Sequence, residues 1–220
     1  CACKTAILVY AGTERRGQSA ETPAQCQRQG KKLCDSEYGL RKDDYILFLG
    51  RIVPEKGVHY LIDAFGKLDT DKKLVIAGGS SDSEEYYEQI KQMAAKDPRI
   101  ILTGFVQGHM LQELYSNAYI YVLPSDLEGM PMSLLEAMSY GNCCLTSDIA
   151  ECTEVVEDKA ASFARGSADA LYEVLDELIR HPQKVQKYKD EAADFITGKY
   201  SWDSVVDQTL ALYKGEKGGE

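Results

Sequence analysis

One short segment of the sequence combines two cations with glycine in a pattern that suits a phosphate ligand. It reads Gly-Arg-Ile-Val-Pro-Glu-Lys-Gly from residue 50 to residue 57 and places Arg51 and Lys56 five residues apart. Cations at a helix start oppose the helix dipole, so their natural partner there is an anion that the helix amides also bind. Solvated surface charge explains the pair equally well when it is taken alone. The whole chain, however, has a net charge of -10. The pair therefore makes this segment locally positive in an acidic protein.

A second segment, residues 124–141, carries two glutamates close to a glycine and a proline. Gly129 allows a backbone to approach a ligand closely, and amides beside Pro131 at a helix start suit an anion. A carboxylate such as Glu128 or Glu136 would repel that anion but can accept hydrogen bonds from neutral hydroxyls, and a ribose diol offers two. Phosphate and diol together describe a nucleotide. Taken alone, Glu136 is explained equally well as a surface residue of the helix.

Other candidate features are weaker. Gly78 and Gly79 follow one apolar run, and Gly104-Phe105-Val106 follow another, where they could offer amides and an apolar wall to a base. Such residues more often serve only turns and the core. The usual glycine-rich dinucleotide and P-loop motifs are absent. The three histidines show no ligand spacing and no Cys-x-x-Cys occurs among the seven cysteines, so we expect free thiols and no metal site, with a metal site in the first 34 residues as the minor alternative.

The elements that must position these residues alternate along the chain. Apolar runs predict buried strands at 45–50, 74–79, 100–102, 119–124 and 143–146, with a weak sixth at 161–164, and three of these runs (45–50, 74–79 and 119–124) end in glycine or proline. Between and after them, helical spacing predicts helices at 58–68, 83–96, 110–117, 131–140, 168–180, 183–197 and 202–214. Alternating strands and helices with short loops predict an α/β fold, a doubly wound parallel sheet with helices on both faces. Ligands of such sheets bind at the carboxyl ends of the strands.

Length and composition bound the architecture and the function class. The chain has 220 residues, of which 44% are hydrophobic and 27% charged, enough for one large domain with a core. We expect an atypical, loop-rich segment at residues 1–40, a Rossmann-like domain at 41–199, a helix at 200–214 and a tail at 215–220. The acidic balance argues against nucleic acid as a partner. No apolar stretch reaches the length of a membrane span.

Taken together, these motifs resemble the carboxyl-terminal half of the group 1 glycosyltransferases (family 4), which have the GT-B fold. The most specific match is Glu128, seven residues and then Glu136, within Glu-Gly-Met-Pro-Met-Ser-Leu-Leu-Glu-Ala-Met. The segment 50–57, the runs 74–79 and 102–106, and Tyr200-Ser201-Trp202 near the end match as well. The resemblance covers about residues 35–214.

The resemblance implies a Rossmann-like domain that binds the donor, a nucleoside-diphosphate sugar with UDP or GDP most expected. Arg51 and Lys56 would hold the diphosphate, and Glu136 would bind the ribose hydroxyls. Glu128 would be the catalytic residue that positions the sugar. The implied donor site is completed by Gly50, Gly78, Gly104, Phe105, Val106, Gly129, Met130, Pro131 and Met132. Transfer would retain anomeric configuration without metal or cofactor, since cations and helix amides neutralise the leaving diphosphate.

The resemblance also implies a partner. Enzymes of this fold have an amino-terminal domain that binds the acceptor, and we expect that domain to be missing from this chain, which would then be inactive alone. We expect a cytoplasmic protein, in which any membrane contact would be made by the missing half. Two alternatives remain open: a stand-alone module that binds a nucleotide sugar without catalysis, and another GT-B enzyme such as a nucleotide-sugar epimerase. Residues 11–32 match nothing in the family.

Overall fold

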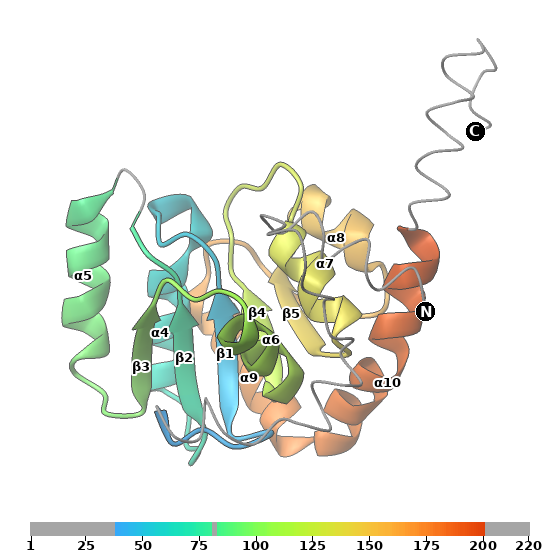
Figure 1. The fold of residues 1–220 in the computed structure, drawn as a ribbon, viewed down its shortest axis with the longest axis horizontal. Coiled ribbons are helices and arrows are strands. Elements are labelled where there is room, and N and C mark those ends of the chain that lie inside the picture. The colour runs from blue at the N-terminus through green and yellow to red at the C-terminus, as the bar shows by residue number, and fades with distance from the viewer. Residues whose placement is uncertain (1–37, 81–82, 201–220) are drawn as a thin grey trace, which may run out of the picture.

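The computed structural model describes residues 38–80 and 83–200, and these form a six-stranded parallel sheet flanked by helices (Figure 1). The strand order is β3-β2-β1-β4-β5-β6, and each neighbouring pair runs parallel. The strands are β1 (Tyr45–Leu49), β2 (Lys73–Ala77), β3 (Ile100–Gly104), β4 (Ile120–Leu123), β5 (Cys143–Ser147) and β6 (Ala161–Phe163). The predicted α/β class and all six strands are confirmed.

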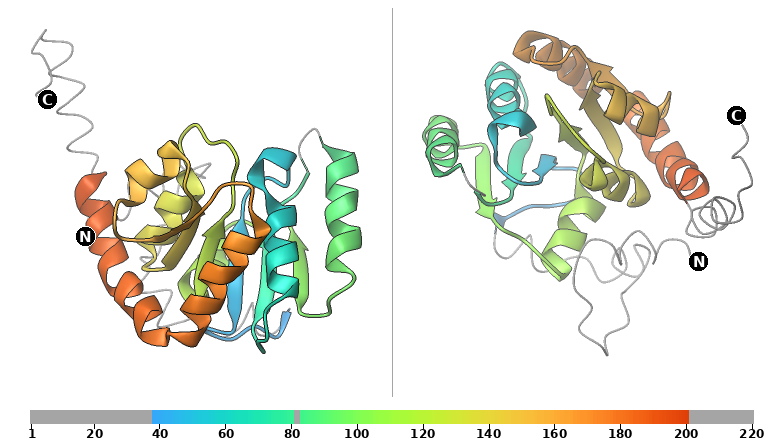
Figure 2. Two further views of the ribbon diagram at one scale, coloured as in Figure 1. Left: turned by 180° about the vertical axis from the view of Figure 1, so that it is seen from behind. Right: turned by 90° about the horizontal axis from the view of Figure 1, so that it is seen from above.

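Helices cover both faces of the sheet, which explains why the central strands are apolar throughout. The helices are α4 (Val58–Gly66), α5 (Glu84–Ala94), α6 (His109–Asn117), α7 (Met132–Ser139), α8 (Ala150–Val156), α9 (Ala168–Arg180) and α10 (Pro182–Lys199). Helices α4 and α9 pack together on one face (Figure 2, left), while α6 and α7 lie on the other (Figure 1). Helix α7 also packs against α10. Because both faces of the central strands are covered, residues such as Leu47, Val75 and Val122 are completely buried.

Two short elements depart from the sequence-based prediction. The segment 51–56 was expected to be a loop, but Pro54–Lys56 form one turn of 3-10 helix, η1. Helix α8 was not expected, because only Cys152, Val155 and Val156 of its seven residues are buried, too few to show a helical period. Cys143 and Cys144 pack in β5 as expected, and burial raises the pKa of the Cys143 thiol to about 12.

Some expectations fall on other parts of the chain. The loop-rich segment at 1–40 lies outside the described residues except for residues 38–40. The helix expected at 202–214 and the tail at 215–220 lie outside them entirely.

The strand order indicates where a ligand would bind. The chain winds outward from β1 through β2 to β3, then returns to β4 and winds outward in the other direction to β6. Neighbouring strands β1 and β4 therefore lead into loops that diverge, and this switch point is where parallel sheets of this kind bind ligands. The loops that follow β1 and β4 lie within the two segments, 50–57 and 124–141, in which the sequence analysis places its main candidate residues.

Candidate donor-binding site

The loops after β1 and β4 are joined directly at the switch point. The Asp126 amide donates a hydrogen bond of 2.8 Å to the Glu55 carbonyl, and the Tyr60 hydroxyl donates to the Asp126 carboxylate at 3.1 Å. Gly57, between η1 and α4, has the left-handed backbone torsion φ of 64°. A Cβ atom at Gly57 would stand 2.1 Å from the Pro124 carbonyl oxygen. This glycine therefore lets the two loops touch, and it fixes where Lys56 lies.

The close contact at Gly57 predicts a large effect on stability. Replacing Gly57 with alanine adds a strained left-handed residue and a backbone clash, so we expect the free energy of unfolding to fall by at least about 1 kcal/mol. Gly66→Ala is the matched control, because a Cβ atom there meets nothing within 4 Å and alanine favours a helix. Urea denaturation measures both variants. If Gly57→Ala were as stable as Gly66→Ala, Gly57 would not hold the two loops together.

Lys56 and Glu128 form the centre of the site. The Lys56 Nζ atom lies 2.6 Å from Glu128 Oε1, and the Ser125 hydroxyl donates to the same oxygen at 2.7 Å. The side chains are 15% and 5% exposed, respectively, so water screens the pair only partly. The structure thus brings together two predicted site residues that are 72 positions apart in the sequence. It adds Ser125, whose carbonyl accepts from the Ser147 hydroxyl of β5 at 2.5 Å.

Arg51 differs from Lys56 in its surroundings. Its side chain is exposed, and it forms no ion pair or hydrogen bond with any residue in 38–80 or 83–200. A guanidinium that binds no described carboxylate is available to a phosphate ligand. Lys56, in contrast, already contacts a carboxylate, so an incoming diphosphate would have to share it with Glu128.

The exits of β1, β2 and β3 are joined by backbone hydrogen bonds. The Gly50 amide donates to Ala77 at 3.0 Å, and the Gly78 amide donates to Gly104 at 2.8 Å. A Cβ atom at Gly78 would stand 1.8 Å from the Gly50 carbonyl oxygen. The packing of these strand exits alone therefore requires glycine at position 78, and a contact with donor there remains a prediction.

The loop before α7 supplies backbone hydrogen-bond donors, although the amides that are available differ from those expected. The Met132 amide donates to the Met130 carbonyl at 2.8 Å, and Pro131 has no amide hydrogen. The amides of Gly129, Met130 and Ser133 donate to no described carbonyl. A Cβ atom at Gly129 would meet nothing within 4 Å. The open side of this loop can therefore offer three amides to an anion.

Glu136 lies beneath this loop and is not a surface residue. It is 6% exposed, which excludes the alternative that it is an ordinary solvated residue of the helix. The Tyr115 hydroxyl, from α6, donates to Glu136 Oε2 at 3.0 Å. Burial raises the pKa of the Glu136 carboxyl, and the Tyr115 hydrogen bond lowers it by a smaller amount. A buried carboxylate with one donor can accept further hydrogen bonds.

The apolar residues expected at the site separate into two groups. Phe105 and Met130 are exposed, 77% and 52% respectively, and extend into solvent at the exits of β3 and β4. Val106 and Met132 are partly buried and pack against the core, and Pro131 is buried. Phe105 and Met130 are therefore the members of this set whose side chains are free to meet a ligand.

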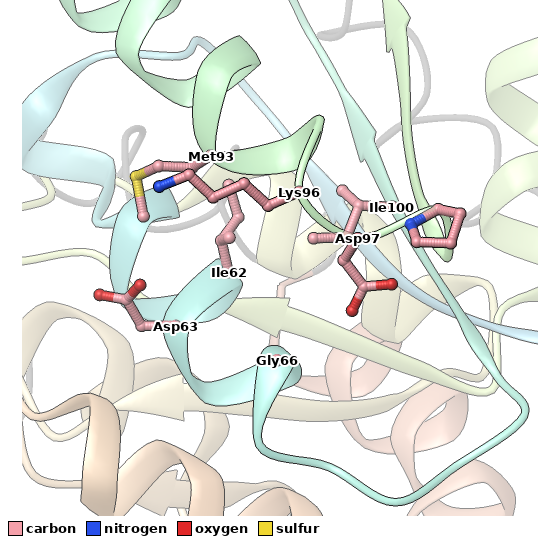
Figure 3. A pocket seen from close by; sticks show the side chains of 8 residues that line it. Ile62, Asp63, Gly66, Met93, Lys96, Asp97 and Ile100 are labelled. Carbon is pink, nitrogen blue, oxygen red and sulfur yellow. The ribbon is translucent and has the colours of Figure 1, made fainter.

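An open pocket lies elsewhere in the molecule. It has a volume of about 330 Å³ and lies between the ends of α4 and α5 (Figure 3), lined by Ile62, Asp63, Gly66, Met93, Lys96, Asp97, Pro98 and Ile100. Ile100 begins β3, so this pocket is at the amino ends of the strands. It is on the opposite edge of the sheet from Lys56, Glu128 and Glu136.

Comparison with protein families identifies the family to which this chain belongs. Residues 35–195 match the family model of the group 1 glycosyl transferases. This chain belongs to the group 1 glycosyltransferases. The match includes both loops of the switch point and the whole sheet, so the resemblance inferred from the sequence is confirmed.

Known relatives in this family include enzymes that act on sugars. An uncharacterized glycosyltransferase of Methanocaldococcus jannaschii is 30% identical over 181 residues, which cover 80% of this chain and 46% of that protein. The alpha-maltose-1-phosphate synthase of Mycobacterium tuberculosis is 29% identical over 216 residues, covering 91% of this chain and 55% of the enzyme. The chain therefore spans about half the length of the curated relatives it matches.

Solved structures confirm the fold as one half of a GT-B glycosyltransferase. Anabaena HepE, in complex with UDP and glucose, matches with a TM-score of 0.77 at 17% identity, covering 89% of this chain and 53% of that one. The C-terminal domain of a group 1 family glycosyl transferase from Francisella tularensis matches with a TM-score of 0.67 at 22% identity. That match covers 83% of this chain and 95% of the domain.

Several site residues were not predicted from the sequence. Ser125 and Gly57 lie within the two marked segments but were given no role, and Tyr115 was counted only as part of a helix. Ser125 could have been inferred from its position, because it directly follows Pro124 at the exit of strand β4. Nothing in the sequence signals that Tyr115 reaches Glu136, because the contact joins two helices and two residues that are 21 positions apart.

No described helix is long and apolar enough to cross a membrane.

Proposed function

We propose that this chain binds the nucleoside-diphosphate sugar donor of a retaining, metal-independent glycosyltransferase. The observation that carries the proposal is the contact between Lys56 and Glu128 at the switch point, with Nζ and Oε1 2.6 Å apart. One cation and one carboxylate, held together where β1 and β4 end, suit a ligand that presents phosphate on one side and sugar hydroxyls on the other. The Gly129, Met130 and Ser133 amides add donors for the phosphate.

Each residue has a distinct role in this proposal. Arg51 and Lys56 bind the diphosphate and stabilise its charge as it leaves, together with the loop amides. Glu136 accepts hydrogen bonds from the ribose hydroxyls. Glu128 positions the transferred sugar, and the donor phosphate takes the proton of the acceptor hydroxyl on the same face of the sugar. The bond from the anomeric carbon to the phosphate breaks as the bond to the acceptor oxygen forms.

Relatives support the ligand class and the need for a second half. HepE has been solved in complex with UDP and with UDP-glucose, so UDP is the first nucleotide to test. The chain covers 46% of the Methanocaldococcus jannaschii relative and 55% of the Mycobacterium tuberculosis enzyme. We propose that the acceptor is bound by a separate amino-terminal domain and that the chain alone binds donor with little or no transfer.

Calorimetry with UDP, GDP, ADP and uridine tests the proposal. We expect the chain to bind one of the diphosphates and to bind its nucleoside much more weakly, because the cations and amides contact the phosphates. ATP and a Gly57→Ala sample serve as controls for nonspecific binding and for loss of the loop contact. Absence of binding for all three diphosphates would refute the proposal.

Metal independence is a separate prediction. We expect EDTA to leave UDP affinity unchanged and added Mg²⁺ to change it by less than about twofold, because Arg51 and Lys56 already supply positive charge. Among the described residues, no three His, Cys, Asp or Glu side chains come together in a way that could hold a metal ion. Calorimetry with and without EDTA decides the matter. Loss of binding in EDTA and its return with Mg²⁺ would contradict the prediction.

The raised pKa of Glu136 predicts a pH dependence of binding. Burial raises the pKa above the ordinary value of 4.5, so the ionised acceptor is lost as the pH falls from 8 toward that value. We expect UDP affinity to fall along this range in the parent. Because the terminal phosphate of UDP also titrates there, Glu136→Gln is the control, and the part of the pH effect due to Glu136 should be missing from it. Identical pH profiles for the two proteins would contradict the assignment.

A further inference from the structure

A buried cluster of tyrosines lies behind Glu136 and is not used by the roles proposed above. Tyr115 and Tyr121 are both completely buried, and their ring centroids are 5.9 Å apart. The Tyr115 ring also stacks on Tyr140, with centroids 5.3 Å apart and planes inclined by 17°. Burial raises the pKa of both the Tyr115 and Tyr121 hydroxyls well above 10, so both remain hydrogen-bond donors at neutral pH.

The two hydroxyl groups have different partners. Tyr115 donates to Glu136 Oε2 at 3.0 Å and lies 3.3 Å from the Ser133 carbonyl, whereas Tyr121 donates to the Ser133 hydroxyl at 2.8 Å. Among the described residues, Tyr115 is the one hydrogen-bond donor to the Glu136 carboxylate. Stacking on Tyr140 restrains the ring of Tyr115, so its hydroxyl is a fixed point against which one carboxylate oxygen is held.

We propose that Tyr115 is a positioning residue that orients the Glu136 carboxylate toward the ribose and so sets the preference of the site for ribose over sugars that lack its hydroxyls. This inference rests on the proposed function, because it needs Glu136 to receive the ribose. By occupying Oε2, Tyr115 leaves Oε1 to the diol. Its hydrogen bond also stabilises the ionised form of a buried carboxyl that burial disfavours.

If Tyr115 had only a structural role, loss of its hydroxyl would change nucleotide affinities in a different way. If Tyr115 only filled the core, losing its hydroxyl would lower stability and weaken every nucleotide alike. If it acts through Glu136, losing the hydroxyl weakens ligands that have ribose hydroxyls and spares those that lack them. It also has no further effect once Glu136 itself has been replaced, since residues that act through each other are not additive.

The test compares Tyr115→Phe with Tyr121→Phe by calorimetry, using UDP and 2′,3′-dideoxy-UDP. Both substitutions remove one hydroxyl from a fully buried ring in the same cluster. We expect Tyr115→Phe to lose about fivefold to tenfold in UDP affinity and less than about twofold for the dideoxy nucleotide. Tyr121→Phe should keep the parent's ratio of the two affinities. In a Glu136→Gln background, Tyr115→Phe should change UDP affinity by less than about twofold.

Each alternative outcome has a definite meaning. An unchanged ribose preference in Tyr115→Phe, equal losses for both nucleotides, or full additivity with Glu136→Gln would overturn the inference while leaving the proposed function intact. Failure of the parent to bind any of UDP, GDP and ADP would overturn the proposed function and this inference with it. Melting curves check folding, and Tyr115→Met is the second hydroxyl-free variant if the phenylalanine variant unfolds.

Discussion

Lys56→Met is expected to lower the affinity for UDP by roughly tenfold to a hundredfold. A charge-assisted hydrogen bond contributes about 1.5–3 kcal/mol, and Lys56 is the cation held at the centre of the switch point. Affinity for uridine should barely change, because the lysine contacts only the phosphates in our proposal. Calorimetry with the two ligands measures the effect. Equal UDP affinity in variant and parent would remove Lys56 from the site.

The same substitution should also lower stability, which provides a way to separate folding from binding. It leaves Glu128, whose side chain is 5% exposed, with Ser125 as its described donor, and an incompletely paired buried carboxylate costs about 1–3 kcal/mol. The double variant Lys56→Met/Glu128→Gln should regain stability but not UDP affinity. Arg51→Ala is the matched control: its side chain is exposed, so it should lose affinity without losing stability.

Glu136→Gln is expected to lower UDP affinity by roughly tenfold or more. Glutamine keeps the shape of the side chain but replaces a charged acceptor with a neutral one and turns one oxygen into a donor. The ribose hydroxyls would then lose charge-assisted hydrogen bonds, which contribute about 1.5–3 kcal/mol each. Binding of 2′,3′-dideoxy-UDP, already weak in the parent, should change little. Parallel losses for both nucleotides would show that Glu136 supports the structure and does not bind ribose.

The stability of this variant should move in the opposite direction from its affinity. Because the folded pKa of Glu136 is raised, the folded protein holds its proton more tightly than the unfolded chain. The contribution of this group to stability is therefore fully present below the unfolded pKa and is lost as the pH rises through the folded pKa. At pH 8 we expect Glu136→Gln to melt at a higher temperature than the parent. A lower melting temperature would mean that the carboxylate stabilises the fold.

The sequence predicted the fold well because burial on both faces leaves a strong signal. Runs such as Tyr45–Leu49 and Ile120–Leu123 are short and apolar at every position, which is typical of a parallel strand covered on both faces. Helix α9 shows the same clarity, with Leu171, Leu175 and Leu178 buried at helical spacing. Short elements lack such repetition, so η1 and α8 were not predicted.

Contacts across the sheet were harder to predict than the elements themselves. The sequence placed Lys56 and Glu128 at two strand exits, but the ion pair between them depends on Gly57 packing against Pro124. Burial of Glu136 could not be read from its helix, because the neighbouring apolar positions lie on another face. The burial is accompanied by a contact with Tyr115 of α6, whose hydroxyl lies within hydrogen-bond distance of the Glu136 carboxylate. Such contacts depend on tertiary packing, which local patterns do not encode.

Mapping of UDP onto the chain by ¹⁵N chemical-shift perturbation shows where the nucleotide binds. We expect the largest shifts on the amides of residues 50–57, 104–106 and 128–136, at the carboxyl ends of the strands, and we expect them to vanish in Lys56→Met at the same UDP concentration. Shifts centred on residues 93–100, beside the pocket between α4 and α5 (Figure 3), would contradict the proposed donor site. Shifts spread evenly over the surface would contradict it as well.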